Sequence, residues 1–131
     1  MSLTQLIYAS RPFGFDEVSM AGILMDARRW NTREEITGAL ICRADIYLQL
    51  LEGPDAAIEA AYHRIRRDDR HMEMRLLSRQ IVEDRLFPAW TMRDDPARSW
   101  FWTKAELDAG ALDRASEAEV LAVFTRISTE T

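Results

Sequence analysis

Residues 36–53 read ITGALICRADIYLQLLEG. It contains two apolar runs, residues 36–42 and 46–52, which are separated only by the short segment 43–45. Two apolar runs joined by so short a connection predict a pair of antiparallel strands in a β-hairpin. We therefore expect a hairpin with a short turn at residues 43–45.

The chain before this hairpin predicts one strand and one helix. Residues 3–9 (LTQLIYA) alternate as a strand does, with Leu6 and Tyr8 on one face. A helix is expected to begin after Asp16, a capping residue, and to run to about Arg29. Three residues at four-residue spacing share one stripe of this helix, and the last lies at or just past its end: Ile23, Ala27 and Asn31.

The chain after the hairpin predicts a second helix and two more strands. Gly53-Pro54-Asp55 opens the helix, and residues 74–82 and 89–93 follow as strands. The resulting order, β-α-β-β-α-β-β, predicts an α+β protein in a ferredoxin-like arrangement. We expect a mixed five-stranded sheet with these two helices on one of its faces.

The C-terminal part of the chain predicts helices on the other face of the sheet. The pairs Thr103–Glu106 and Ser116–Glu119 have the spacing of helix capping boxes. The last helix has one apolar stripe: Val120, Val123, Phe124 and Ile127. Such a stripe needs a surface to pack on, and the free face of the sheet offers one. Residues 1–95 are therefore expected to form the domain, with 96–131 as a helical extension and not an independent domain.

The composition excludes several classes of function. The chain has 131 residues, of which 47% are hydrophobic, and a formal net charge of -5, so we expect one globular domain that binds no nucleic acid. A single cysteine and two histidines are too few for a structural Cys/His zinc site, and no metal is expected. No apolar run or leader-like segment indicates a membrane span or export, so a cytoplasmic protein is expected. Phosphate-binding glycine loops and nucleophile motifs are absent from the sequence, so no catalytic residue and no enzyme are expected.

One polar residue interrupts the second strand of the hairpin. Gln49 should share a face with Tyr47 and Leu51. If that face is buried, the amide needs hydrogen-bond partners and can point at a polar ligand. If the face is exposed, Gln49 has no special role. Other residues also have an ordinary interpretation beside a functional one: Tyr8, Trp90 and Met92 as core residues, Asn31 as a helix cap, and Arg70 and His71 as a solvated loop.

Five blocks of the sequence, taken in order, resemble the BLUF family of blue-light sensors that use FAD. The blocks are residues 6–10 (LIYAS), 27–31 with 36–40 (ARRWN and ITGAL), 47–53 (YLQLLEG), 69–71 (DRH) and 87–92 (FPAWTM). Together they span roughly residues 3–93. The chain departs from the family pattern at Trp30, where some members have a polar residue, and at Tyr47, which replaces the commoner Phe.

The resemblance implies FAD held non-covalently between the two helices that pack on the sheet. Tyr8 would be the photoactive tyrosine, and Gln49 would bridge it to the flavin. Asn31 would bond the O4/N3 edge of the ring, Ile23 would pack against the ring, and Arg70 would approach its O2 side. His71 is also implied as a cofactor contact. Arg28 or Arg29 would meet the ribityl-phosphate end, with no choice between the two. Trp90 and Met92 would occupy the switch positions near the glutamine.

The function implied is that of a stand-alone blue-light photoreceptor. Light would drive electron and proton transfer from Tyr8 through Gln49 and rearrange the flavin's hydrogen bonds. The signal would leave through strand 89–93 and the C-terminal helices to a protein partner, with the chain in a homodimer or larger homo-oligomer. Two other functions fit the same fold: a small phosphatase-like enzyme of ferredoxin-like fold, and a ligand-binding regulatory module without photochemistry. Only the photoreceptor should be yellow.

Overall fold

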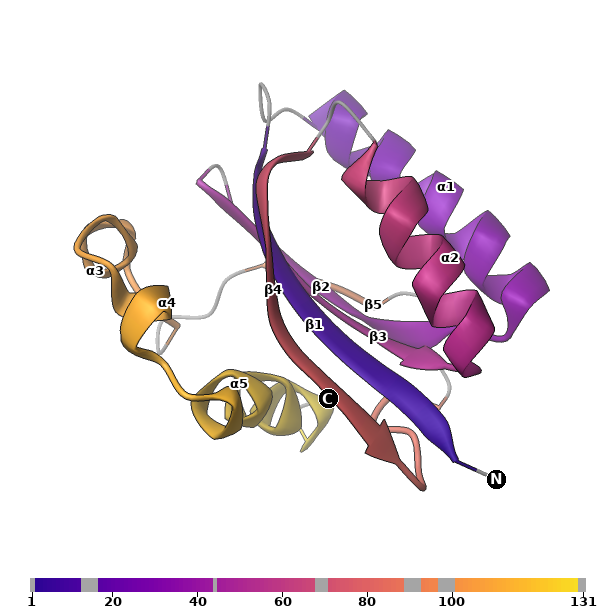
Figure 1. Ribbon diagram of the computed structural model, residues 1–131. Helices are drawn as coiled ribbons and strands as arrows, with labels where there is room; N and C mark the ends of the chain where they lie inside the picture. Colours follow the sequence, from indigo (N-terminus) through magenta and orange to yellow (C-terminus); the bar gives the residue numbers. More distant parts are fainter. Residues whose placement is uncertain are drawn as a thin grey trace.

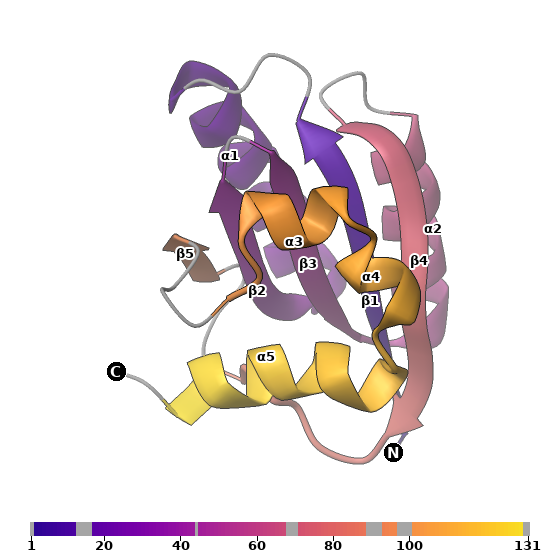
Figure 2. The same ribbon diagram turned by 90° about the vertical axis from the view of Figure 1, so that its left-hand side faces the viewer.

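A single sheet lies between two groups of helices in the computed structural model, which describes residues 2–12, 17–43, 45–67, 71–88, 93–96 and 101–129 (Figure 1). The strands, in sheet order, are β4 (His71–Val82), β1 (Leu3–Pro12), β3 (Ile46–Gly53), β2 (Thr37–Arg43) and β5 (Arg93–Pro96). The helices are α1 (Glu17–Glu34), α2 (Asp55–Arg66), α3 (Lys104–Asp108), α4 (Ala111–Arg114) and α5 (Glu117–Thr129). Helices α1 and α2 cover one face, and α3, α4 and α5 lie on the other (Figures 1 and 2). The α+β class is confirmed.

The hairpin at the centre of the chain is confirmed. Strands β2 and β3 pair antiparallel, with Arg43 opposite Ile46. Strand β1 pairs antiparallel with both β3 and β4. Strand β5 runs parallel to β2 at the edge of the sheet. We expected this last strand at residues 89–93, but residues 89–92 lie outside the described part of the chain, and β5 runs from Arg93 to Pro96.

Alternation along the strands creates two separate cores. The helix-side core, between the sheet and α1 and α2, contains Leu6, Tyr8, Ile23, Leu24, Ile36, Leu40, Tyr47, Leu51, Ile58 and Ala61. The tail-side core includes Ile7, Leu48, Leu50 and Phe87 from the sheet side and the α5 residues Val120, Val123, Phe124 and Ile127. The predicted stripe of the last helix is thus buried against the sheet. Each large apolar side chain buried in this way contributes roughly 1.5–3 kcal/mol.

Helix α1 is longer than the sequence pattern predicts. The helix was expected to end near Arg29, but it continues to Glu34. Residues 30–34 (WNTRE) contain no glycine or proline that would stop a helix. The chain leaves the helix at Glu35, whose φ of 61° is left-handed, and the Ile36 amide donates to the Asn31 carbonyl at 2.9 Å. Asn31 therefore lies inside the last turns of α1 and not beyond its end.

The two predicted capping boxes are present in the tail. Thr103 Oγ1 accepts from the Glu106 amide at 3.1 Å while the Glu106 carboxyl accepts from the Thr103 amide at 2.9 Å. The Ser116–Glu119 box has the same reciprocal bonds. The short helix α4 between them was not predicted. No described helix combines the length and the apolar character that a membrane crossing requires.

Among the glycines described, Gly38 has the least room for a side chain, because β2 and β3 lie close together there. A Cβ atom at this position would lie 1.9 Å from the Leu50 carbonyl oxygen and 3.0 Å from its carbonyl carbon. Both are backbone atoms of the paired strand, so the strands would have to separate. We expect Gly38→Ala to lower the free energy of unfolding by about 2 kcal/mol or more, as measured by chemical denaturation.

Gly53→Ala is the matched control for this prediction. Its Cβ would meet the Glu35 carbonyl oxygen at 2.9 Å and the Ile36 Cα at 3.3 Å, so the overlap with backbone atoms is much smaller than at Gly38, although the Glu35 turn must still shift. The loss should therefore be smaller than for Gly38→Ala. Equal losses, or a Gly38 variant as stable as the wild type, would contradict the packing described here.

Candidate functional site

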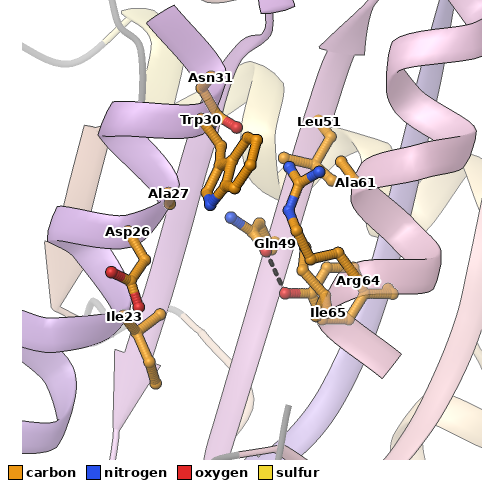
Figure 3. A pocket seen from close by; sticks show the side chains of 11 residues that line it. Ile23, Asp26, Ala27, Trp30, Asn31, Gln49, Leu51, Ala61, Arg64 and Ile65 are labelled. Atoms are coloured by element: carbon orange, nitrogen blue, oxygen red, sulfur yellow. Dashed lines mark hydrogen bonds between the residues drawn. The ribbon is translucent and has the colours of Figure 1, made fainter. Parts of the chain in front are cut away.

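A pocket opens between α1 and α2, with β1 and β3 as its floor (Figure 3). These four elements bring together residues that are far apart in sequence. The lining residues are Tyr8, Ile23, Asp26, Ala27, Trp30, Asn31, Gln49, Leu51, Ala61, Arg64 and Ile65. The walls are largely apolar, and a small number of polar groups converge on the interior, as is typical of cofactor pockets.

The floor of the pocket carries a hydrogen-bonded pair. Tyr8 and Gln49 are direct partners in the antiparallel register of β1 and β3. The Tyr8 hydroxyl donates to Gln49 Oε1, and the bond of Gln49 is drawn in Figure 3. Gln49 is 2% exposed and Tyr8 is 0% exposed. The interpretation of Gln49 as a residue on an exposed strand face is therefore wrong.

One wall of the pocket is the predicted stripe of α1. Ile23, Ala27 and Asn31 all line the pocket, and the Asn31 side chain is buried. The other wall is α2, where Tyr62 packs at a tilt against Tyr8 with 6.2 Å between the ring centroids. Helix α1 thus brings the Asn31 amide to the cavity, and α2 contributes Ala61, Arg64 and Ile65 to its lining.

Trp30 and Arg64 close one end of the pocket, and sequence reasoning assigned neither of them to the site. Both point toward the space above Gln49 in Figure 3. The Arg64 guanidinium lies over the Trp30 ring, 4.5 Å from its centroid, and Nη1 lies 3.6 Å from Glu34 Oε1. Arg64 therefore connects α2 to α1 across the pocket.

A sequence signal for these residues existed. Asp26 and Trp30 follow Ile23 at i+3 and i+7, so they extend the Ile23–Ala27–Asn31 stripe to a full helix face. Arg64 follows the core residue Ala61 at i+3. Its place in the last turn of α2 by itself indicates only a cation that the helix dipole favours.

The other predicted site residues are not brought to the pocket by the described structure. Arg28 and Arg29 are exposed on α1 and do not line the pocket, and Arg29 Nη2 lies 3.9 Å from Asp26 Oδ1. Arg70, Trp90 and Met92 fall outside the described residues. His71 is the first residue of β4, and only its backbone is described. The described residues contain no group of three or more His, Cys, Asp or Glu side chains placed to bind a metal.

The donor set of the pocket fits a flat, partly apolar ring with a polar edge. Ile23, Ala27 and Leu51 offer apolar surface, while the amides of Asn31 and Gln49 offer both donors and acceptors. The Tyr8 hydroxyl and Gln49 Oε1 can also exchange a proton, because they are already hydrogen-bonded. An isoalloxazine ring, with apolar faces and an edge of carbonyl and nitrogen atoms, matches this arrangement.

A protein-family model matches most of the chain. A model described as "BLUF: Sensors of blue-light using FAD" matches residues 3–93. The beta subunit of photoactivated adenylate cyclase from Euglena gracilis is 33% identical over 92 residues, which are 70% of this chain but 10% of that protein. The chain thus spans about a tenth of the length of the curated relatives that it matches.

Solved structures similar to this chain include one that the chain covers almost completely and a longer one that it covers only in part. The dark-state structure of BlrB, a BLUF protein, superposes with a TM-score of 0.80 at 29% identity, covering 99% of this chain and 98% of that one. Klebsiella pneumoniae BlrP1 with FMN and cyclic diGMP superposes with a TM-score of 0.68 at 29% identity, covering 92% of this chain but 30% of that one.

The contact between Trp30 and Arg64 can be measured without any ligand. We expect a double-mutant cycle of Trp30→Leu and Arg64→Met, followed by chemical denaturation of cofactor-free protein, to give a coupling energy of about 0.5–1 kcal/mol. Arg66→Met with Trp30→Leu is the control, because Arg66 lies over Tyr62 instead. A coupling no larger for Arg64 than for Arg66 would show that the two side chains do not close the pocket together.

Proposed function

The chain belongs to the BLUF family, the sensors of blue-light using FAD, and from that premise we propose that the pocket between α1 and α2 holds a non-covalently bound FAD as its light-absorbing group. One observation carries this proposal: the buried hydrogen bond from Tyr8 to Gln49 on the floor of the pocket. A phenol and an amide in contact, enclosed by apolar walls, provide a donor and a carrier for one proton. Both groups would lie beside the bound flavin ring.

The chain's own residues would hold the cofactor as follows. Asn31 and Gln49 bond the polar edge of the ring, and Ile23 packs against its face. Arg64 provides a cation at the pocket for a carbonyl or a phosphate of the cofactor. The other candidates for a cofactor contact are Arg28, Arg29, Arg70 and His71. FAD is favoured over FMN by the family description, although the similar BlrP1 structure is named with FMN.

When bound, the flavin supplies blue-light absorption and a strong one-electron oxidant. Tyr8 would be the electron and proton donor, and Gln49 Oε1 would accept the proton. Return of the electron, and of a proton from either Oε1 or Nε2 of Gln49, would restore the phenol. The Gln49 amide is left rotated or in its other tautomer, so that it presents a different donor and acceptor pattern. A single hydrogen bond is worth only about 1 kcal/mol net, so the signal must bias a nearly balanced element.

We further propose that strand 89–93 and the C-terminal helices carry the signal to a protein partner. Trp90 and Met92 would be the residues of that strand that respond to Gln49. Two described features support the route: β5 pairs with β2 beside the β2–β3 hairpin, and α5 is buried on the opposite face of the sheet. We propose a protein partner because the proposed signal is a change in the surface that this strand and these helices present.

The domain organisation is proposed in the same terms. Residues 1–95 would form the flavin-binding domain, and 96–131 a helical extension that is not independent, since α5 contributes to the tail-side core. The order β4-β1-β3-β2 with both helices on one face supports a ferredoxin-like classification. The chain itself is proposed to be a sensor and not an enzyme.

Self-association is the last part of this proposal. Strand β4 lies at one edge of the sheet and exposes Leu76 at 47% and Ile81 at 77%. Large apolar side chains on an edge strand favour pairing with another chain. They support the homodimer or larger homo-oligomer that the resemblance implies.

An absorption spectrum tests the proposed function. The purified protein should be yellow, its heat-released cofactor should co-elute with FAD, and blue light should shift the flavin band reversibly to longer wavelength. A colourless protein that cannot be reconstituted, or a yellow one without a reversible shift, would overturn the proposal.

Tyr8→Phe is expected to keep the flavin and to lose the light-induced shift. The ring still fills its place in the core, and only the hydroxyl that donates to Gln49 is removed. The measurement is the light-minus-dark absorption difference at matched flavin occupancy. Gln49→Ala should also fail to shift, but with an altered dark spectrum, because the amide beside the ring is gone. A normal photocycle in Tyr8→Phe would remove Tyr8 from the mechanism.

Asn31→Ala is expected to weaken cofactor retention more than it alters the photochemistry. Loss of a buried polar contact costs about 1–3 kcal/mol, which is roughly one to two decades in affinity. The measurement is flavin occupancy after extensive dialysis, with Thr32→Ala as the control because Thr32 is the exposed neighbour on the same helix. Equal occupancy in both variants would count against a ligand contact by Asn31.

A further inference from the structure

A buried carboxyl group anchors the segment that follows β4 to the end of β3. Glu52 is 0% exposed, and its two oxygens accept hydrogen bonds from two consecutive backbone amides. Oε2 accepts from the Leu86 amide at 2.9 Å, and Oε1 accepts from the Phe87 amide at 2.6 Å. Because each oxygen has its own donor, residues 86 and 87 can take only one position relative to β3.

The same carboxyl group is held from the two neighbouring strands. Gln5 of β1 approaches Oε2 at 3.5 Å, and Thr37 of β2 approaches Oε1 at 3.4 Å. Gln5 is also the register partner of Glu52, just as Tyr8 is the partner of Gln49. The β1–β3 pair therefore carries two polar side-chain pairs, one on each face of the sheet and three residues apart.

Arg85 ties this segment to the end of α1 as well. Nη1 donates to Thr37 Oγ1 at 2.8 Å and to the Glu52 carbonyl at 3.0 Å, and Nη2 donates to the Glu35 carbonyl at 2.7 Å. Glu35 directly follows α1, and the adjacent Ile36 amide donates to the Asn31 carbonyl. The segment is thus fixed to the strand that carries Gln49 and to the helix that carries Asn31.

The far side of this segment contacts the tail. Phe87 is 2% exposed, and its ring meets Phe124 of α5 edge to face, with 6.4 Å between centroids and an angle of 88°. Phe124 is itself fully buried. Closely packed aromatic pairs resist gradual deformation, so a displacement of one ring displaces the other.

We propose that Glu52 is a positioning residue that transmits movements of β3 at Gln49 to α5, through the Phe87 amide and the contact between Phe87 and Phe124. This route rests on the proposed photochemistry of Tyr8 and Gln49, and it is separate from strand 89–93. Its physical basis is that every link is buried and has one defined geometry. The strand connects Gln49 to Glu52, the carboxyl group connects Glu52 to Phe87, and the rings connect Phe87 to α5.

The test is hydrogen exchange of the flavin-loaded full chain in dark and light, with Phe87→Leu compared with Phe101→Leu. Both substitutions remove a buried ring from the tail-side core, but the ring neighbour of Phe101 is Trp102. Phe87→Leu should keep the spectral shift while the light-dependent exchange difference in residues 117–127 falls by a factor of about two or more. Phe101→Leu should keep both. An unchanged difference in Phe87→Leu, or an equal loss in Phe101→Leu, overturns the route.

Glu52→Gln tests the carboxyl group itself. An amide in its place turns one acceptor into a donor that faces a backbone amide, so the Leu86 and Phe87 amides should exchange faster already in the dark. The spectral shift should persist while the light-dependent difference in 117–127 falls as in Phe87→Leu. Loss of the shift in this variant, or a full tail response, overturns the proposal. If Glu52→Gln does not fold, Phe87→Leu decides alone, because it keeps every hydrogen bond of Glu52.

The wild-type protein distinguishes a failure of the proposed photochemistry from a failure of the route through Glu52. A wild type without a reversible spectral shift overturns the proposed photochemistry and the route with it. A wild type that shifts but shows no exchange difference in 117–127 overturns the route alone.

Discussion

The antiparallel register of β1 and β3 is the constraint on which the rest of the structure depends. It places Tyr8 opposite Gln49 on one face and Gln5 opposite Glu52 on the other. A slip of one residue would turn every side chain of one strand to the opposite face. The phenol and the amide would then no longer meet, and apolar side chains of each strand would leave the cores that they fill.

Two further contacts depend on that register. Strand β2 can pair closely with β3 only because Gly38 has no side chain toward Leu50. The pocket can form only because α1 and α2 pack on the same face as the Tyr8–Gln49 pair, with Arg64 reaching from α2 toward Glu34 and Trp30 of α1. The site is therefore assembled from sequence-distant elements that the sheet holds at fixed positions.

The parts of this arrangement that follow from local periodicity were predictable. The hairpin, the stripe of Ile23 with Ala27 and Asn31, and both capping boxes each appear in a short window of sequence. The contacts of Arg64 and Arg85 were not predictable in this way. Arg85 meets Glu35 across 50 residues of sequence, and the Phe87 amide meets Glu52 across 35. No spacing rule signals such pairs, since they depend on how the segment after β4 lies on the end of the sheet. The end of α1 was missed for a related reason: its stop is a left-handed Glu35, a residue type that seldom marks one.

The division of the sheet into two cores has a consequence for how such a protein can diversify. Within the described part of the chain the two cores share no residue, because adjacent residues on a strand face opposite ways. Substitutions that retune the tail can accumulate at alternate positions while the neighbouring positions keep the cofactor site. Natural or engineered variants can thus change how the tail packs and what it contacts while the cofactor site stays the same.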